Sequence, residues 1–379
     1  MTGKPGENPE ERPRRRTRRI VSSAEVIDFL EYLAPPSLSV PEETWGLQTG
    51  AASAPIKTIV LSPMASFNAL STSAAHKQSL LLTCAPLITK PLHSVSKDDP
   101  IGAKVAYLLE HRINLYVLAN SFASAPGGFD DSLAEKLGLA ATSALVPTTF
   151  EPQYKLAVYT PPSDVEKVMR ASAEAGGGHI GNYSHCSFQT HGIGTYLPRE
   201  GSRPTSGNVG RLENADEVRL EMLVPQRELQ GVIAAILEVH PYEEVAYDVY
   251  VVKNPGVLYG RGRIGELPLQ VSLETVLAQV QDALVVKSVR CSHRADLPIS
   301  SLAAASGVCD GLFWPANRAG AGALIAGGAS LQDLMLADNS TTVVIDIGYS
   351  ASVSPGLLRL KEQLKDTFGQ DGLSVIYSA

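Results

Sequence analysis

The spacing of apolar and polar residues predicts an α/β fold for the first part of the chain, from Val21 to about Gly138. Ala24–Leu33 has the spacing of a helix that faces a core, and Ser22 or Ser23 provides an N-cap. Strands are expected at Lys57–Leu61, Ser79–Cys84 and Ile113–Leu118, and helices at Gly102–His111 and Ser132–Leu137. Such alternation predicts a parallel or mixed sheet with helices on its faces. The adjacent acids Asp130 and Asp131 are interpreted as caps of the last helix.

The middle of the chain, Tyr154–Val252, has a different pattern that predicts a ferredoxin-like unit. Strands are expected at Tyr154–Thr160, Arg219–Val224 and Ala246–Val252, and helices at Ser163–Ala175 and Arg227–Val239. Together with one further strand this is the order strand–helix–strand–strand–helix–strand. The glycine-rich run 176–194 is interpreted as a loop with tight turns. Ala140–Gln153, which contains Pro147 and Pro152, is interpreted as a linker.

After Gly256 the alternation of helices and strands returns, so the middle unit is interpreted as an insertion into one α/β domain. Elements are expected at Ser272–Leu284, Ala323–Ala326, Leu331–Ala337, Thr342–Ile347 and Pro355–Phe368. The predicted organisation is a disordered basic tail at 1–20, a first α/β segment at 21–150, the insert at 151–255 and a second α/β segment at 256–379.

Composition indicates an ordinary globular protein of the cytoplasm. Of the 379 residues, 44% are hydrophobic and 19% are charged, and no apolar run is long enough to cross a bilayer. Four scattered cysteines lack the spacing of a disulfide framework. The net charge of −7 gives no reason to expect that the folded body binds nucleic acid. The Arg12–Arg19 cluster could contact an anion or RNA, or could simply keep the tail soluble.

Two long irregular strings carry the most specific signal. Residues 176–198 contain three glycines, Ile-Gly-Asn-Tyr, Ser-His-Cys-Ser-Phe and a Gly-x-Gly-x-Tyr turn, and residues 240–244 read His-Pro-Tyr-Glu-Glu. In this order they resemble the insert of the GTP cyclohydrolase 1 type 2 homologues, the Nif-three-like dinuclear-metal proteins. The second string is also similar to the CutA and PII-like scaffold. The resemblance implies an α/β (α+β) fold in two segments, a CutA/PII-like insert, two divalent metal ions and hexameric rings.

The positions that would hold the metals in this family have other residues here. His-His-Pro corresponds to Cys84, Ala85 and Pro86, and His-Thr-Asn-x-Asp corresponds to Ala119–Ala123. Thr-Gly-Glu followed by a His pair becomes Ala326–Gly328, then Leu331 and Gln332, and Gly-His-x-x-Thr-Glu becomes Gly348–Val353. The non-ligating replacements are Ala85, Ala123, Gly328, Tyr349 and Val353. A pair of hydrolytic metals needs bridging carboxylates and imidazoles, so no metal and no cofactor are expected at Cys84, Ala85, Ala123, Tyr349 and Val353.

Three interpretations of function follow. The favoured one is a degenerate, ring-forming scaffold or regulatory protein, not an enzyme, which assembles as a homo-oligomer of six chains without a membrane partner. The second is a GTP cyclohydrolase-like hydrolase that uses another site. The third is a sensor of a small ligand or metal that binds through the insert, where the candidates are His185, Cys186, His240 and Glu243. Each of the histidines could equally have a structural role, since His240 precedes Pro241 at the end of a predicted helix.

Overall fold

The computed structural model describes residues 19–38, 43–118, 120–202, 207–292, 298–338 and 340–379. Two compact units divide the chain, with Val146–Arg261 as one unit and the flanking segments, up to Leu145 and from Gly262, as the other. The predicted basic tail lies outside the described residues except for Arg19 and Ile20. Within the described part, no helix is both long and apolar enough to cross a membrane.

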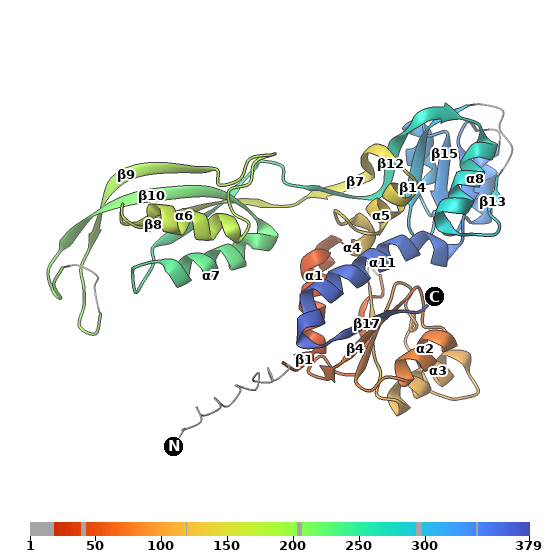
Figure 1. The fold of residues 1–379 in the computed structure, drawn as a ribbon, viewed down its shortest axis with the longest axis horizontal. Coiled ribbons are helices and arrows are strands. Elements are labelled where there is room, and N and C mark those ends of the chain that lie inside the picture. The colour runs from red at the N-terminus through yellow and green to blue at the C-terminus, as the bar shows by residue number, and fades with distance from the viewer. Residues whose placement is uncertain (1–18, 39–42, 119, 203–206, 293–297, 339) are drawn as a thin grey trace, which may run out of the picture. The chain divides into compact units, whose positions relative to one another are not determined.

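The flanking unit contains a five-stranded sheet in the order β17-β4-β5-β6-β2, in which only β2 runs antiparallel to its neighbour (Figure 1). Its strands are β2 (Gly46–Thr49), β4 (Thr58–Ser62), β5 (Ser79–Thr83), β6 (Asn114–Val117) and β17 (Ser374–Tyr377). Two short strands, β1 (Val21–Ser22) and β3 (Pro55–Ile56), form a separate antiparallel pair. The three predicted strands of the first segment are therefore confirmed.

The same unit contains a six-stranded sheet in the order β13-β16-β15-β14-β12-β7. Its strands are β7 (Ala140–Phe150), β12 (Leu258–Val271), β13 (Arg290–Cys291), β14 (Ile299–Ala305), β15 (Ala323–Ala326) and β16 (Val343–Asp346). The prediction of a linker at Ala140–Gln153 was wrong, because most of this segment is β7. Its partner strand β12 begins more than a hundred residues later in the chain, so the local sequence pattern around β7 does not show the pairing.

Helices cover both faces of the five-stranded sheet. The helices of the flanking unit are α1 (Ser23–Leu33), α2 (Phe67–Ala74), α3 (Pro100–Glu110), α4 (Ser121–Ser124), α5 (Phe129–Lys136), α8 (Leu273–Leu284), α9 (Phe313–Arg318), α10 (Leu331–Ala337) and α11 (Tyr349–Phe368), together with the 3-10 turns η1 (Pro36–Leu38) and η3 (Gly369–Asp371). Ser22 caps α1 and forms a capping box with Glu25, as the sequence predicted. Helix α11 starts six residues before the predicted Pro355, which lies inside it.

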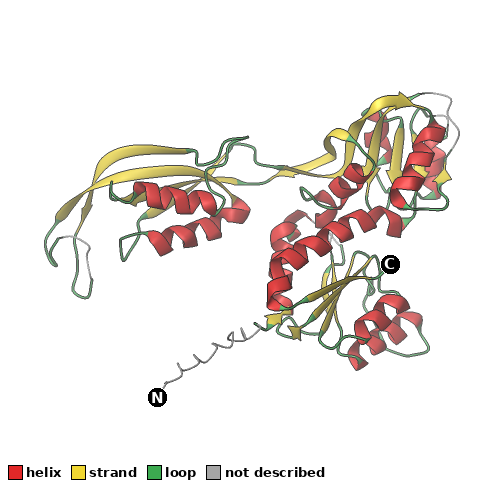
Figure 2. Cartoon of the chain, viewed as in Figure 1, coloured by secondary structure: helices red, strands yellow, loops and turns green. Residues whose placement is uncertain are grey.

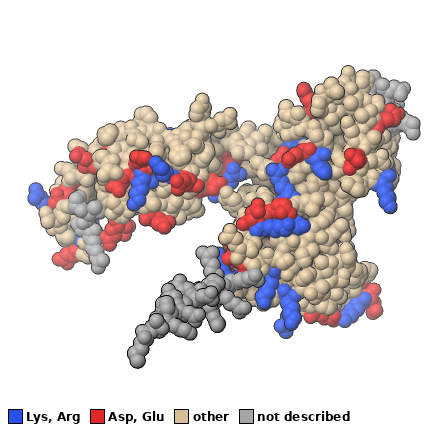
Figure 3. Space-filling model, viewed as in Figure 1, with Lys and Arg blue, Asp and Glu red and all other residues tan. Residues whose placement is uncertain are grey.

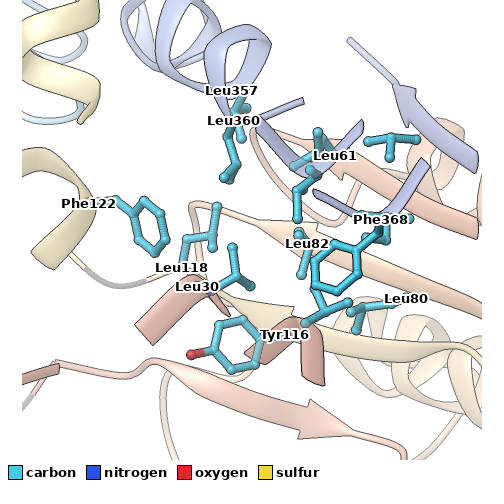
Figure 4. Packing of buried hydrophobic residues seen from close by; sticks show 14 of the residues in the cluster. Leu30, Leu61, Leu80, Leu82, Tyr116, Leu118, Phe122, Leu357, Leu360 and Phe368 are labelled. Carbon is cyan, nitrogen blue, oxygen red and sulfur yellow. The ribbon is translucent and has the colours of Figure 1, made fainter. Parts of the chain in front are cut away.

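Side chains along β4 and β5 alternate between two hydrophobic clusters, as the pleat of a strand requires. Leu61, Leu80 and Leu82 face α1 and α11, where they meet Leu30 and Leu357 (Figure 4). The residues between them face α2 and α3 in the opposite cluster. This arrangement explains why these strands are continuously apolar, since a sheet buried on both faces has no solvent side.

The insert has the predicted ferredoxin-like topology. Its elements are β8 (Gln153–Thr160), α6 (Val165–Glu174), β9 (Ser187–Tyr196), β10 (Glu213–Pro225), η2 (Gln226–Glu228), α7 (Leu229–Val239) and β11 (Tyr247–Val252). The strands form an antiparallel sheet in the order β11-β8-β10-β9, and both helices lie on one face (Figure 2). The interpretation of 176–194 as a loop was wrong from Ser187 onward, because all ten residues of β9 pair with β10.

Asp130 and Asp131 do not cap a helix that starts at Ser132. They lie in the first turn of α5, whose N-cap is Gly128. The fully buried carboxylate of Asp130 accepts hydrogen bonds from the Gly262 amide at 2.6 Å and from the Ser306 amide at 2.7 Å. It joins α5 to two segments far away in the sequence, while Asp131 pairs with the buried Arg263.

Candidate functional site

Among the residues that replace the expected metal ligands, Ala123 and Val353 lie in the hydrophobic interior of the flanking unit. Leu331, which is 74% exposed, and Gln332 lie at the surface. Val353, on the second turn of α11, is 2% exposed and is part of the cluster that also contains Leu357 and Phe122. Ala123 in α4 is 4% exposed. Cys84 and Tyr349 are partly buried and pack against the same cluster. These positions are therefore occupied by side chains in apolar contact.

The loop after β5 carries Cys84, Ala85 and Pro86. The amide of Ala85 donates to the carbonyl of Pro63 at 3.0 Å, and the hydroxyl of Thr83 donates to the carbonyl of Ala85 at 3.0 Å. Burial raises the pKa of the Cys84 thiol far above its ordinary value, because an apolar environment disfavours the thiolate. Cys84 is thus a neutral thiol at the end of a buried strand.

The loops at the carboxyl ends of β14, β15 and β16 are held against one another by hydrogen bonds, some of which are accepted by the carboxylate of Asp346. The Gly307 amide donates to Oγ of Ser352 at 2.9 Å, and the Gly327 amide donates to the Gly307 carbonyl at 2.7 Å. A Cβ atom added at Gly327 would lie only 2.1 Å from that Oγ, so only glycine fits at this contact. Gly328, at the expected carboxylate position, accepts from the Cys309 amide at 2.8 Å.

Two polar side chains from the segment before and within β2 hold the loops that carry the substituted positions. Oε1 of Gln48 accepts from the amides of Leu87 and Ile88, both at 3.0 Å, and its Nε2 donates to the Ile88 carbonyl at 2.7 Å. Oε1 of Glu43 accepts from the amide of Asn120 at 2.7 Å. This clamping role is not apparent from the sequence pattern.

In the insert, His240 is a structural histidine. It is 8% exposed, its Nε2 lies 3.1 Å from the carbonyl oxygen of Tyr159, and its Nδ1 accepts from the amide of Tyr242 at 3.1 Å. Both ring nitrogens are therefore used in a neutral tautomer that donates from Nε2. Burial lowers the pKa of His240, although the hydrogen bond to Tyr159 acts in the opposite direction.

The other insert candidates do not join His240. Cys186 is adjacent to Ser187, which pairs with Met222, whereas Tyr159 pairs with Arg219. This register separates Cys186 from the His240 contact by roughly 13 Å along the sheet. His185 and Glu243 are exposed. Among all described residues, no three His, Cys, Asp or Glu side chains are grouped so that they could hold a metal ion.

Comparison with known proteins gives the family. The model of the Duf34/NIF3 family (NGG1p interacting factor 3) matches residues 21–379. The chain belongs to this family. A curated relative is the GTP cyclohydrolase 1 type 2 homolog of Bacillus subtilis (strain 168), which is 36% identical over 307 residues, or 81% of this chain and 82% of that protein.

Two further family matches cover nearly the whole chain. The GTP cyclohydrolase 1 type 2 homolog of Mycobacterium bovis is 32% identical over 355 residues, covering 92% of this chain and 93% of that protein. A crystal structure of the Bacillus cereus protein related to NIF3 has a TM-score of 0.84 at 30% identity, covering 95% of this chain and 97% of that one. The predicted family and mixed α/β fold with its inserted ferredoxin-like unit are confirmed.

Proposed function

We propose that this chain is a member of the Duf34/NIF3 family that lacks the dinuclear metal centre and acts as a ring-forming scaffold or regulatory protein. The observation that supports this most strongly is the environment of Val353 and Ala123. Both are nearly fully buried at positions where the family resemblance implies carboxylates. An unpaired carboxylate is costly in such surroundings, whereas an apolar side chain stabilises them.

The available donors do not fit two divalent cations. Hydrolytic metal pairs take oxygen and imidazole ligands, often with bridging carboxylates. Here the corresponding positions offer the neutral thiol of Cys84, the phenol of Tyr349 and the amide of Gln332, and the others are Ala85, Ala123 and Val353. No protonation change turns alanine or valine into a ligand. Accordingly, no catalytic step is assigned to a metal in this protein.

A function that depends on assembly is consistent with what the chain retains. The clamps made by Gln48 and Ser352 keep the surrounding loops in place by neutral hydrogen bonds. Soluble oligomers usually have closed symmetry, and the family resemblance implies six chains. We therefore propose a homohexamer in which the flanking units and the inserts contribute separate contacts.

Metal analysis of the purified full chain tests this proposal. We expect well under one transition metal per chain, before and after incubation with zinc or manganese followed by gel filtration. About two ions per chain would overturn the proposal. A single equivalent that disappears in His185→Ala would favour the sensor interpretation, with His191→Ala as the matched control. The names of the relatives suggest GTP as the substrate to test, and we expect no ring opening above a protein-free control. Turnover that scales with protein would favour the hydrolase alternative.

A further inference from the structure

A groove of about 700 Å³ lies between three helices of the flanking unit. It is lined by residues of α5, by the end of α8 and by the first half of α11, the helices labelled in the upper right of Figure 1. Sites that bind small organic molecules usually have volumes of about 300–1,000 Å³. The groove therefore has the size of a small-molecule site.

The groove uses the face of α11 that points away from the hydrophobic core. Ala351, Pro355 and Leu358 line it and recur at spacings of four and three residues, which is the periodicity of one helix face. The opposite face of the same helix carries Val353 and Leu357, which belong to the core cluster. A ligand in the groove is therefore independent of the substituted metal position at residue 353.

The hydroxyl groups in the groove are used within the chain. Oγ of Ser132 donates to the carbonyl of Gly128 at 2.7 Å, and Oγ of Ser354 donates to the carbonyl of Ser350 at 2.6 Å. Apart from these two serines, the uncharged residues that line the groove are apolar. The groove therefore suits the apolar body of a ligand, because neither hydroxyl hydrogen is free to bind a polar one.

Two cations and one anion line the groove, which leaves an excess of one positive charge. The guanidinium of Arg359 donates to the carboxylate of Glu135 at 2.9 Å. Lys136 is exposed and has no ion-pair partner among the described residues. Figure 3 shows acidic and basic side chains side by side where Figure 1 places α5 and α11. Because Glu135 already has a partner, the ammonium group of Lys136 remains available to an anionic group.

Val285, which lines the groove at the end of α8, has a backbone conformation that is unfavourable for valine. Its φ is +55°, in the left-handed region, and its side chain is 89% exposed. Glycine or asparagine usually occupies such a place after a helix, because a branched side chain is strained there. Strained residues are concentrated at active sites and ligand clamps. The fold alone favours glycine at this position, whereas an apolar wall of the groove requires a side chain.

We propose that this groove binds a small organic anion with an apolar body, such as a medium-chain carboxylate. The apolar body contacts Leu284, Val285 and Leu358, and the carboxylate pairs with Lys136. A neutral apolar molecule uses the same walls without this ion pair. The proposal goes beyond the scaffold function and does not depend on it.

Isothermal titration calorimetry of the full chain with octanoate and with neutral 1-octanol tests the apolar walls. We expect one octanoate per chain. Leu358→Gln should weaken the binding of both molecules by about tenfold, because less apolar area is buried. The matched control is Leu237→Gln on α7 of the insert, since Leu358 and Leu237 are 46% and 45% exposed. Absence of octanoate binding, or equal affinity of these two variants, would overturn the proposal.

Lys136→Gln tests the charge of the ligand. It should weaken octanoate binding by about two- to fivefold, as expected for an exposed ion pair, and leave octanol binding unchanged. Lys167→Gln, which changes an exposed helix residue of the insert, is the control and should alter neither affinity. Equal loss of octanoate and octanol binding in Lys136→Gln would contradict the assignment of an anionic ligand.

Val285→Gly distinguishes a binding role from a structural one. Glycine tolerates the left-handed conformation, so the melting temperature should not fall, whereas the affinity for both molecules should decrease. Octanoate should also slow hydrogen exchange of residues 281–286 in the wild type. If exchange of these residues without ligand is slow and becomes faster on dilution, a second copy covers the groove and the proposal is wrong. A Val285→Gly chain that melts earlier and binds octanoate normally would equally overturn it.

Discussion

Val353→Glu places a carboxylate where the family resemblance implies one, and it tests whether this part of the interior is dry. Val353 is 2% exposed and is the fifth residue of α11, in contact with the cluster that contains Phe122 and Leu357. Glutamate favours helices, so helix propensity does not explain any loss of stability. The perturbation is therefore a change of polarity and volume inside an apolar cluster.

The expected magnitude follows from the proton equilibrium of the new side chain. A buried glutamate can have a pKa of about 8–9, so it would be protonated in the folded state at pH 7. The pKa of a glutamate in the unfolded chain is about 4.3, so keeping this side chain protonated in the folded state at pH 7 costs about 3.7 kcal/mol. The extra atoms add about 1–3 kcal/mol, which Val353→Gln shares.

The sign of the pH dependence distinguishes this mechanism from simple overpacking. Because the folded pKa of the new carboxyl is raised, the folded state holds its proton while the unfolded state loses it above about pH 4.3. The deficit relative to Val353→Gln therefore grows with pH, from about 1 kcal/mol at pH 5 to about 3.7 kcal/mol at pH 7. Val353→Gln has no titrating group at this position.

Urea unfolding followed by tryptophan fluorescence is a suitable assay, because both tryptophans, Trp45 and Trp314, lie in the flanking unit. Val353→Glu and Val353→Gln would be compared with wild type at pH 5 and pH 7. Equal stability of the two variants at both pH values would refute the reasoning, since it would mean that water or an ion reaches position 353. Recovery of Val353→Glu on addition of zinc or manganese would have the same meaning.

Two further predictions concern the clamp and the buried histidine. Gln48→Leu removes three hydrogen bonds to the loop after β5 and should lower the free energy of unfolding of the flanking unit by about 2–4 kcal/mol. The control Gln332→Leu changes an exposed residue and should have little effect. The same fluorescence assay measures both variants. Burial lowers the pKa of His240, so its contribution to stability is present above the unfolded value of 6.5 and is lost as pH falls below it. His240→Gln should therefore flatten the calorimetric stability profile of the insert below about pH 6.5, and an unchanged slope would contradict the assignment.

The sequence predicted the elements whose formation depends on local pattern. Helix α1 was located through its cap at Ser22, and β4, β5 and β6 through continuous apolar runs. The two strands that were interpreted as a linker and a loop, β7 and β9, contain proline or glycine residues that are disfavoured in strands. Other strands, such as β12 and β14, were not predicted either. Long-range pairing with β12 and β10 outweighs that local preference, which is a tertiary effect that residue spacing does not reveal.

The candidate site was predictable only in part, for a related reason. The identities of Cys84, Ala123 and Val353 could be read from their place in the family motifs. Their burial could not, because it depends on contacts among α1, α4, α11 and the strands. The same limit applies to Asp130, whose partners Gly262 and Ser306 are 132 and 176 residues away. The adjacent acids suggested a helix cap, although the structure uses them to join distant segments.

Two sets of positions in this region differ in what they retain: the side chains that bind backbone groups, and the positions where metal ligands are expected. The groups that hold backbone, such as Gln48 and Ser352, have partners within the chain and need no ion. At positions 123 and 353, where the family resemblance implies carboxylates, the side chains are buried alanine and valine. A hydrolase that had only lost its activity would need neither the retained hydrogen bonds nor apolar packing at the former ligand positions, since open, hydrated space there would cost little. Apolar packing, together with the hydrogen bonds of Gln48 and Ser352, instead stabilises the loops around these positions. Both features are therefore what the proposed scaffold function predicts.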